Sequence, residues 1–122
     1  MRETGFMGKT QPVGSPDEAK RARQNEIERL RDPSHVEALS PIGLETLLTS
    51  CGLTVEGMAS GTVARELGEW CRVAGAPPEV AARVRVLLLD TRAGDLAGMA
   101  PMLVGEELRF RHTWMNIVGR RP

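Results

Sequence analysis

The sequence predicts a single domain of the α/β class, and three features of the chain lead to this prediction. A serine followed by a proline, at Ser15-Pro16 and again at Ser40-Pro41, is typical of a helix start. The second of these helices ends at Gly52 and runs directly into an alternating stretch, Leu53–Glu56, which indicates half of a βαβ unit. The apolar stretch Trp114–Val118 is typical of a strand that is covered on both faces.

The first fourteen residues, Met1–Gly14, are expected to form a flexible leader, because they hold three glycines and a proline without any periodicity. Residues 15–122 are then expected to form one domain, since a chain of 122 residues is too short for two. A first helix is predicted to begin at Ser15, which can cap it. This helix should end near Arg31, because the residue before Pro33 is pushed out of the helical region.

The middle of the chain predicts a helix, a strand and a pair of helices. Ser40–Gly52 carries leucines at helical spacing, and Leu53–Ala59 is predicted to be a strand. Thr62–Ala74 is predicted to be a third helix, and Ala76–Glu79 opens a fourth. Two helices in series exceed what a minimal crossover needs, so they indicate an inserted helical hairpin, a common cover for a binding cleft.

The C-terminal part predicts a β-hairpin after a loop at Thr91–Ala100. Its strands are Pro101–Val104 and Glu107–Gly119, and Gly105-Glu106 between them suits a type II′ turn.

A central strand at Trp114–Val118 needs two neighbours, and Leu53–Ala59 can supply only one. The leader offers no second neighbour, because it lacks an apolar run and Pro12 would interrupt a ladder. An unpaired edge along Trp114–Val118 is therefore expected.

Composition and charge exclude several classes of function. The 16 basic and 16 acidic side chains give a formal net charge of zero, which argues against a nucleic-acid binder. The longest apolar run, Val86–Leu89, is far too short to cross a membrane, and the N-terminus has no signal-peptide core, so a cytoplasmic location is expected. Cys51 and Cys71 are expected to be reduced and buried, and neither they nor His35 and His112 show a metal-ligand spacing.

The densest set of polar groups lies in Asn25–Pro41, around Arg31, Asp32 and His35. A carboxylate beside a histidine could serve acid–base chemistry near neutral pH. The reading that the sequence favours is a capped turn, in which Asp32 or Ser34 bonds to the backbone and His35 lies on the surface. Three further side chains are interpreted as structural: Trp70, Trp114 and His112. No catalytic, cofactor-binding or metal-ligating residue is assigned.

The segment Arg31–Val36, which reads Arg-Asp-Pro-Ser-His-Val, with Asn25–Glu28 before it, resembles a segment of class I S-adenosylmethionine-dependent methyltransferases. The resemblance is to the type that includes quinone-biosynthesis enzymes. In that family the segment follows the fifth strand of a seven-stranded Rossmann-like sheet, whose last strand is antiparallel between the fifth and the sixth. The resemblance implies that Leu53–Ala59 is strand six and that Glu107–Arg121 is the last strand. The chain is thus similar to the C-terminal, substrate-side half of such an enzyme, with an incomplete sheet.

The resemblance also implies a missing half. The family holds its cofactor through a glycine-rich turn after strand one, and no GxGxG occurs in this sequence. The chain alone is therefore expected neither to bind S-adenosylmethionine nor to be catalytic. Its expected partner is an N-terminal half or a second copy. A small-molecule methyl acceptor is implied, with Arg31, Asp32 and His35 near its pocket.

A second hypothesis comes from a different class of function. It is a non-catalytic binding or assembly module that adds another strand to the exposed edge of Trp114–Val118.

Overall fold

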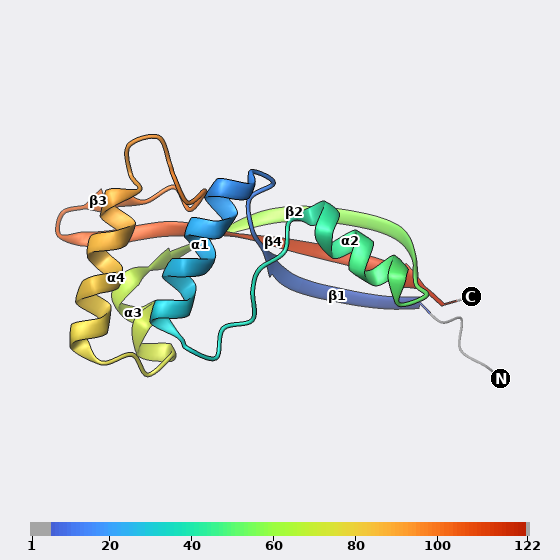
Figure 1. Cartoon of the computed structure of the whole chain (residues 1–122), viewed down its shortest axis with the longest axis horizontal. Helices are drawn as coiled ribbons and strands as arrows, with labels where there is room; N and C mark the ends of the chain where they lie inside the picture. Colours follow the sequence, from blue (N-terminus) through green and yellow to red (C-terminus); the bar gives the residue numbers. More distant parts are fainter. Residues whose placement is uncertain (1–5, 122) are drawn as a thin grey trace.

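The computed structural model describes residues 6–121, so Met1–Gly5 and Pro122 lie outside the description. Within this range the chain is an α/β fold with four helices and an open antiparallel sheet, as predicted (Figure 1). The strands are β1 (Phe6–Val13), β2 (Thr54–Glu66), β3 (Met102–Val104) and β4 (Glu107–Arg120). The helices are α1 (Glu18–Arg31), α2 (Pro41–Ser50), α3 (Leu67–Val73) and α4 (Pro78–Asp90).

Strand β4 is the central strand of the sheet. It pairs antiparallel with β1 along one edge and with β2 along the other, and β3 folds back onto its first residues. The prediction that the end of the chain forms a central strand is therefore confirmed.

The prediction of a flexible leader is wrong for Phe6–Val13, because these residues form β1 and pair with β4 from Arg120 to Thr113. Pro12 stands opposite Trp114 in this ladder. Proline is tolerated there because β1 is an edge strand, where its missing N–H group can face away from the ladder. Strand β1 is thus the second neighbour of the central strand, and the expected open edge along Trp114–Val118 does not exist. Among the described residues, the outer edges of the sheet belong to β1 and β2.

The prediction that the third helix begins at Thr62 is also wrong, because β2 continues to Glu66. The strand persists because each residue from Thr62 to Glu66 has a partner on β4, and this pairing outweighs the local helix signal. Helix α3 begins one residue later, where the Glu66 carboxylate accepts hydrogen bonds from the backbone N–H groups of Gly68 at 2.6 Å and Glu69 at 3.0 Å. Helices α3 and α4 still form the predicted pair between two strands.

The predicted start of the second helix is confirmed, whereas the predicted start of the first helix is wrong. Ser40 caps α2 as expected, and its hydroxyl accepts a hydrogen bond from the Gly43 N–H at 3.0 Å. Helix α1 begins later than predicted, because Asp17 and not Ser15 is its cap. The C-terminal hairpin is confirmed, and Gly105 has the positive φ, +64°, that the first position of a type II′ turn requires.

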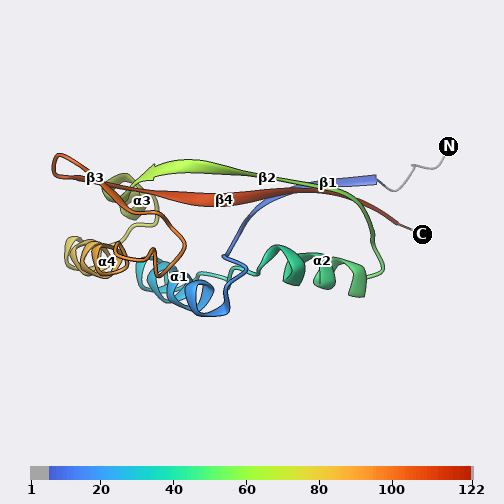
Figure 2. The same ribbon diagram turned by 90° about the horizontal axis from the view of Figure 1, so that it is seen from above.

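Two apolar clusters hold the layers together, and helices α1, α2 and α4 lie on the same side of the sheet (Figure 2). The larger cluster joins α1, α3 and α4 to the first half of β4 through Leu108 and Phe110. The smaller cluster joins α2 to the second half of β4 through Met115 and Ile117. The buried residues of β4 have even numbers up to His112 and odd numbers from Met115 onward. Because side chains alternate along a strand, β4 presents opposite faces to the two clusters, as a long twisted strand can.

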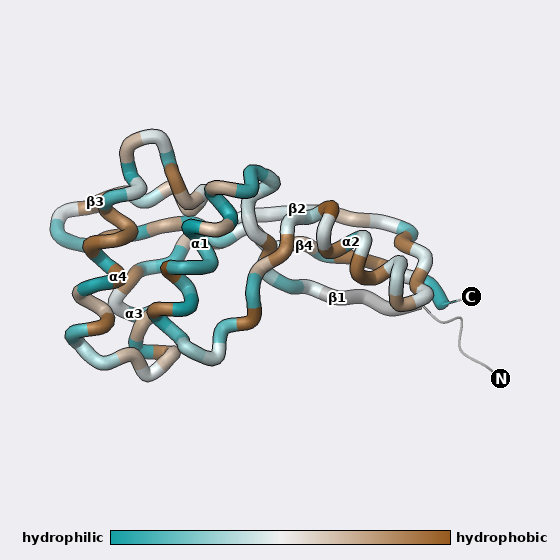
Figure 3. Tube along the Cα trace, viewed as in Figure 1, coloured by the Kyte–Doolittle hydropathy of each residue, from teal (hydrophilic) through white to brown (hydrophobic). Residues whose placement is uncertain are grey.

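Helix α1 is mostly hydrophilic along its length (Figure 3). Only Ile27 on this helix belongs to the large buried cluster. The same helix buries three polar side chains: Gln24, Asn25 and Glu28. Its inner face is therefore held by hydrogen bonds as much as by apolar contact. The side chains that make these bonds belong to the candidate site or lie beside it.

The two cysteines lie in different environments. Cys71 is buried, and burial raises the pKa of its thiol, whereas Cys51 is exposed. The prediction that both are buried is therefore wrong for Cys51, which lies at the end of α2. In the described part of the chain, every helix is too short or too polar to span a membrane.

Replacing Leu88 by alanine tests the large cluster. Leu88 on α4 is fully buried, so Leu88→Ala is expected to lower the free energy of unfolding by about 2–5 kcal/mol through the cavity it leaves. Val86 on the same helix is 58% exposed, and Val86→Ala should change stability by less than about 1 kcal/mol. Urea denaturation of both variants measures the difference. Equal losses would show that α4 does not pack as described.

Candidate functional site

A cavity of about 740 Å³ opens between the end of α1, the segment that follows it, α3 and the middle of β4. Its polar lining includes Glu28, Arg31, His35, Arg65 and His112. Apolar side chains complete the wall, among them Leu39, Leu47 and Trp114. The cavity lies beside the point where β4 changes its buried face, between the two apolar clusters.

Asn25 fixes the segment that forms one wall of this cavity. Its carboxamide N–H groups donate to the carbonyl oxygens of Arg21 at 3.1 Å and Ala38 at 3.2 Å. Its oxygen accepts from the Ala38 N–H at 2.7 Å and contacts the His35 Nε2 at 2.9 Å. These contacts bind the segment after α1 back onto the helix, and they set the direction of His35.

The same contacts determine which His35 nitrogen carries a proton. The Asn25 oxygen can only accept, and the Ala38 N–H and the two carbonyls fix the orientation of the amide. The His35 Nε2 is therefore the donor in its bond to Asn25. Its Nδ1 faces the Glu28 carboxylate at 3.9 Å.

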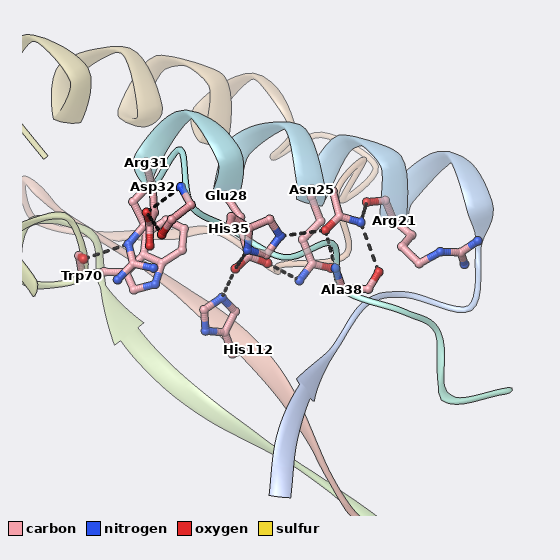
Figure 4. A network of polar contacts seen from close by, with 11 residues as sticks. Arg21, Asn25, Glu28, Arg31, Asp32, His35, Ala38, Trp70 and His112 are labelled. Atoms are coloured by element: carbon pink, nitrogen blue, oxygen red, sulfur yellow. Dashed lines mark hydrogen bonds and ion pairs between the residues drawn. The ribbon is translucent and has the colours of Figure 1, made fainter. Parts of the chain in front are cut away.

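Glu28 lies between the two histidines of the chain (Figure 4). One carboxylate oxygen is 3.9 Å from the His35 Nδ1 and 3.7 Å from the His112 Nε2. The other oxygen accepts a hydrogen bond from the Gln24 side chain at 2.8 Å. All three charged or titratable side chains are largely buried, and His112 and Glu28 are each only 7% exposed. A buried carboxylate shared by two imidazoles is an arrangement suited to acid–base chemistry.

His112 is enclosed by aromatic rings. The centroid of its ring lies 5.4 Å from that of Trp70 and 5.3 Å from that of Phe110, both in edge-to-face geometry. Burial lowers the pKa of His112, and the cationic Arg65 and Arg31 lower it further, while Glu28 opposes them. The imidazole is therefore neutral near neutral pH and can accept a proton.

Of the three residues that the sequence singled out, Arg31 and His35 line the cavity and Asp32 does not. Arg31 lines the cavity, where its Nε donates to the Trp70 carbonyl at 2.9 Å and its guanidinium stacks on the Trp70 ring at 4.2 Å. Burial lowers the pKa of Arg31. His35 also lines the cavity, and its side chain is only 15% exposed, so the expectation of a surface histidine is wrong.

Asp32 does not line the cavity. It ends α1 and accepts hydrogen bonds from the Ser34 hydroxyl at 2.7 Å and the Ser34 N–H at 3.0 Å, which lower the pKa of its carboxyl. The capped turn expected from the sequence is therefore present at Asp32.

Three buried nitrogen atoms of the described residues have no hydrogen-bond partner: Arg65 Nε, His112 Nε2 and Trp114 Nε1. All three residues line the cavity. Sequence reasoning assigned structural roles to His112 and Trp114, and it did not single out Arg65 or Glu28. The three-residue spacing of Asn25 and Glu28, which puts them on one helix face, was the available signal for Glu28. Arg65 could be placed only through its pairing with Phe110 on β4.

Metal binding finds no support in the described residues, since no group of three histidine, cysteine, aspartate or glutamate side chains within residues 6–121 is arranged to hold an ion.

Replacing Asn25 by alanine should destabilise the protein strongly. The change leaves the buried N–H and carbonyl of Ala38 without partners, so a loss of roughly 2–4 kcal/mol in the free energy of unfolding is expected. Glu26→Ala, on the exposed face of the same helix, is the matched control and should cost less than about 1 kcal/mol. Denaturant titration of both variants compares them. A loss in Asn25→Ala no larger than in the control would remove Asn25 as the link between helix and segment.

The stability of the folded chain should depend on pH through His112. Its pKa is lower in the folded than in the unfolded state, where the ordinary value is 6.5, so the unfolded state binds more protons as the pH falls below that value. The contribution of neutral His112 is present above pH 6.5 and is lost progressively below it. Urea denaturation at a series of pH values should show this loss in the natural protein. The loss should be smaller in His112→Gln, and an identical pH dependence would contradict the assignment.

Comparison with known proteins supports the fold. No protein-family model and no curated protein sequence matches the chain. Among solved structures, BH2331 from Bacillus halodurans C-125, a presumed methyltransferase, superimposes with a TM-score of 0.88 at 15% identity. The YcgJ protein from Bacillus subtilis superimposes with a TM-score of 0.83 at 20% identity. The superposition on BH2331 covers 100% of this chain and 58% of BH2331, and the superposition on YcgJ covers 99% of this chain and 53% of YcgJ. The chain therefore has the fold of about half of a methyltransferase-like protein.

Proposed function

We propose that this chain is the C-terminal, substrate-side portion of an S-adenosylmethionine-dependent methyltransferase and holds a small-molecule methyl acceptor in the cavity beside His112. The observation that carries the proposal is the superposition of the whole chain on only 58% of BH2331. Arg31 and His35, which the family resemblance places near the substrate, line the cavity. A cytoplasmic location belongs to the same proposal.

The turn that follows β1 does not fit the cofactor. The turn from β1 into α1 contains a single glycine, Gly14, whose N–H donates to the Leu39 carbonyl at 2.8 Å. The space that a side chain at Gly14 would need is filled by Arg21, whose Cγ would lie 2.7 Å away. That backbone therefore offers no open cradle of N–H groups. We infer that a second polypeptide, or a preceding part of the same one, must supply the cofactor site.

Strand β1 offers a place for such a partner. Its outer edge has no strand neighbour among the described residues, so its backbone N–H and C=O groups can pair with another strand. A missing N-terminal half could extend the sheet at this edge, and a second copy of the chain could cover it in the same way.

The alternative function, a non-catalytic assembly module, draws on the same open edges. The edge first expected to be free, along Trp114–Val118, is paired on both sides, so the module would have to use the outer edge of β1 or β2. The polar cavity favours the methyltransferase proposal, because strand addition alone gives no reason to bury Glu28 between two histidines.

Calorimetric titration of the purified chain with S-adenosylhomocysteine tests the proposal, together with its mass from light scattering. We expect no binding by the chain alone. In the matched experiment, the part of YcgJ that the superposition leaves uncovered is fused ahead of Phe6, and we expect the fusion to bind the ligand.

Binding by the unfused chain would overturn the proposal that the cofactor site is missing. A folded fusion that fails to bind, alongside an unfused chain that forms stable dimers, would favour the assembly module. Unfused YcgJ residues, assayed in the same way, control for a cofactor site that needs no help from this chain.

A further inference from the structure

The Glu28 carboxylate keeps one oxygen without a hydrogen-bond donor. Gln24 donates to its Oε2, whereas the nearest groups to its Oε1 are the His35 Nδ1 at 3.9 Å and the His112 Nε2 at 3.7 Å, both beyond hydrogen-bond distance (Figure 4). The Glu28 side chain is only 7% exposed, so water satisfies little of its charge. Glu28 lines the cavity, and its Oε1 is not among the fully enclosed atoms that lack a partner. A ligand in the cavity can therefore reach this oxygen, and a positively charged N–H donor is the group that suits it.

Negative charge exceeds positive charge around the cavity. Among the described residues, the lining holds two arginines, Arg31 and Arg65, against four carboxylates: Glu28, Glu37, Glu66 and Glu69. His112 is neutral near neutral pH, because burial lowers its pKa, and His35 can add at most one positive charge. The carboxylates therefore outnumber the positive groups in either state of His35. Such a balance favours a cationic ligand and opposes an anionic one.

The two arginines are engaged with the protein, while two of the carboxylates face solvent. The Arg31 Nε donates to the Trp70 carbonyl, and its guanidinium lies over the Trp70 ring. The Arg65 Nε is fully enclosed. Glu37 and Glu69, in contrast, are exposed. A molecule that enters the cavity from solvent therefore passes these two carboxylates, which attract a cation toward Glu28.

Exposed apolar side chains border the same cavity. Val36 after α1, Leu47 on α2 and Val73 on α3 all line it, and all three are exposed. Exposed apolar side chains that gather at one concave site are typical of a ligand-binding groove. The volume of about 740 Å³ lies within the range of small-molecule sites. The ligand should therefore carry an apolar body beside its charged group.

We propose that the ligand of this cavity is an amine with an apolar body: its positively charged N–H group donates to the Glu28 Oε1, and its body lies against Val36, Leu47 and Val73. Trp114 lines the same cavity, and aromatic rings attract organic cations. An alcohol of the same shape would meet the apolar side chains equally well but would offer Glu28 a weaker donor. The inference rests on the proposed function and deepens it, because it gives the chemical class of the methyl acceptor.

Tryptophan fluorescence tests the proposal on the full chain without a label, because both tryptophans of the chain, Trp70 and Trp114, line the cavity. Three probes share a phenylbutyl group and differ in charge: phenylbutylamine, phenylbutanol and phenylvalerate. At neutral pH the first is a cation, the second is neutral and the third is an anion. We expect the amine to bind about tenfold more tightly than the alcohol, and the carboxylate to bind most weakly. Added salt should weaken the binding of the amine more than that of the alcohol.

Two variants test the residues that the proposal names. Glu28→Gln keeps the size of the side chain and removes its charge, so it should lower the affinity for phenylbutylamine about tenfold and leave that for phenylbutanol unchanged. The double variant Glu37→Gln, Glu69→Gln changes only exposed side chains and should lower the affinity for the amine about threefold. Glu79→Gln, on the exposed start of α4 and outside the cavity lining, is the matched control and should have no effect. Circular dichroism checks that each variant is folded, and the double variant decides the matter if Glu28→Gln is not.

The proposal is overturned if the alcohol or the carboxylate binds as tightly as the amine, if none of the probes binds, or if the preference for the amine survives in both variants. The titration needs no cofactor, so its failure can be told apart from failure of the proposed function. A cofactor-binding fusion beside a cavity without amine preference would leave the proposed function standing and remove the amine as its acceptor. Amine binding beside a folded fusion that binds no cofactor would leave the amine site and remove the methyltransferase function.

Discussion

The double pairing of β4 is the constraint on which the rest of the structure depends. This strand is the last element of the chain, yet it holds the first described element, β1, on one side and β2, from the middle, on the other. Both apolar clusters pack against it, one along its first half and one along its second half. Both clusters join residues that are far apart in the sequence. The packing of the fold therefore depends on contacts between distant parts of the chain.

The change of buried face on β4 also creates the site. Near Thr113 and Trp114 neither cluster fills the space above the strand, and polar groups from α1 and the following segment occupy its rim. Asn25 holds that segment, and Glu28 on the same helix face stands between two imidazoles. A hydrophilic helix can be buried here because most of its inward polar groups find partners. Among the described residues, the three buried side-chain nitrogens without a hydrogen-bond partner belong to β2 and β4, and their residues line the cavity.

The chain superimposes on only 58% of BH2331 and 53% of YcgJ. The described residues enclose a cavity of about 740 Å³, and the sheet ends at β1 with an edge that can accept a further strand.

The sequence by itself determined the α/β class, the Ser40 cap, the helical pair, the hairpin at Gly105 and the capped turn at Asp32, because each depends on neighbours within a few residues. It also singled out Arg31 and His35, which both line the cavity. Only the tertiary structure showed that Phe6–Val13 is a strand and that β2 continues to Glu66. Neither stretch has a clear apolar pattern, and each forms a strand because it pairs with β4, which is distant in the sequence. The surroundings of Glu28, Arg65 and His112 were decided in the same way. These surroundings depend on distances between α1, β2 and β4. Local sequence patterns cannot predict those distances, because the three elements are far apart in the chain.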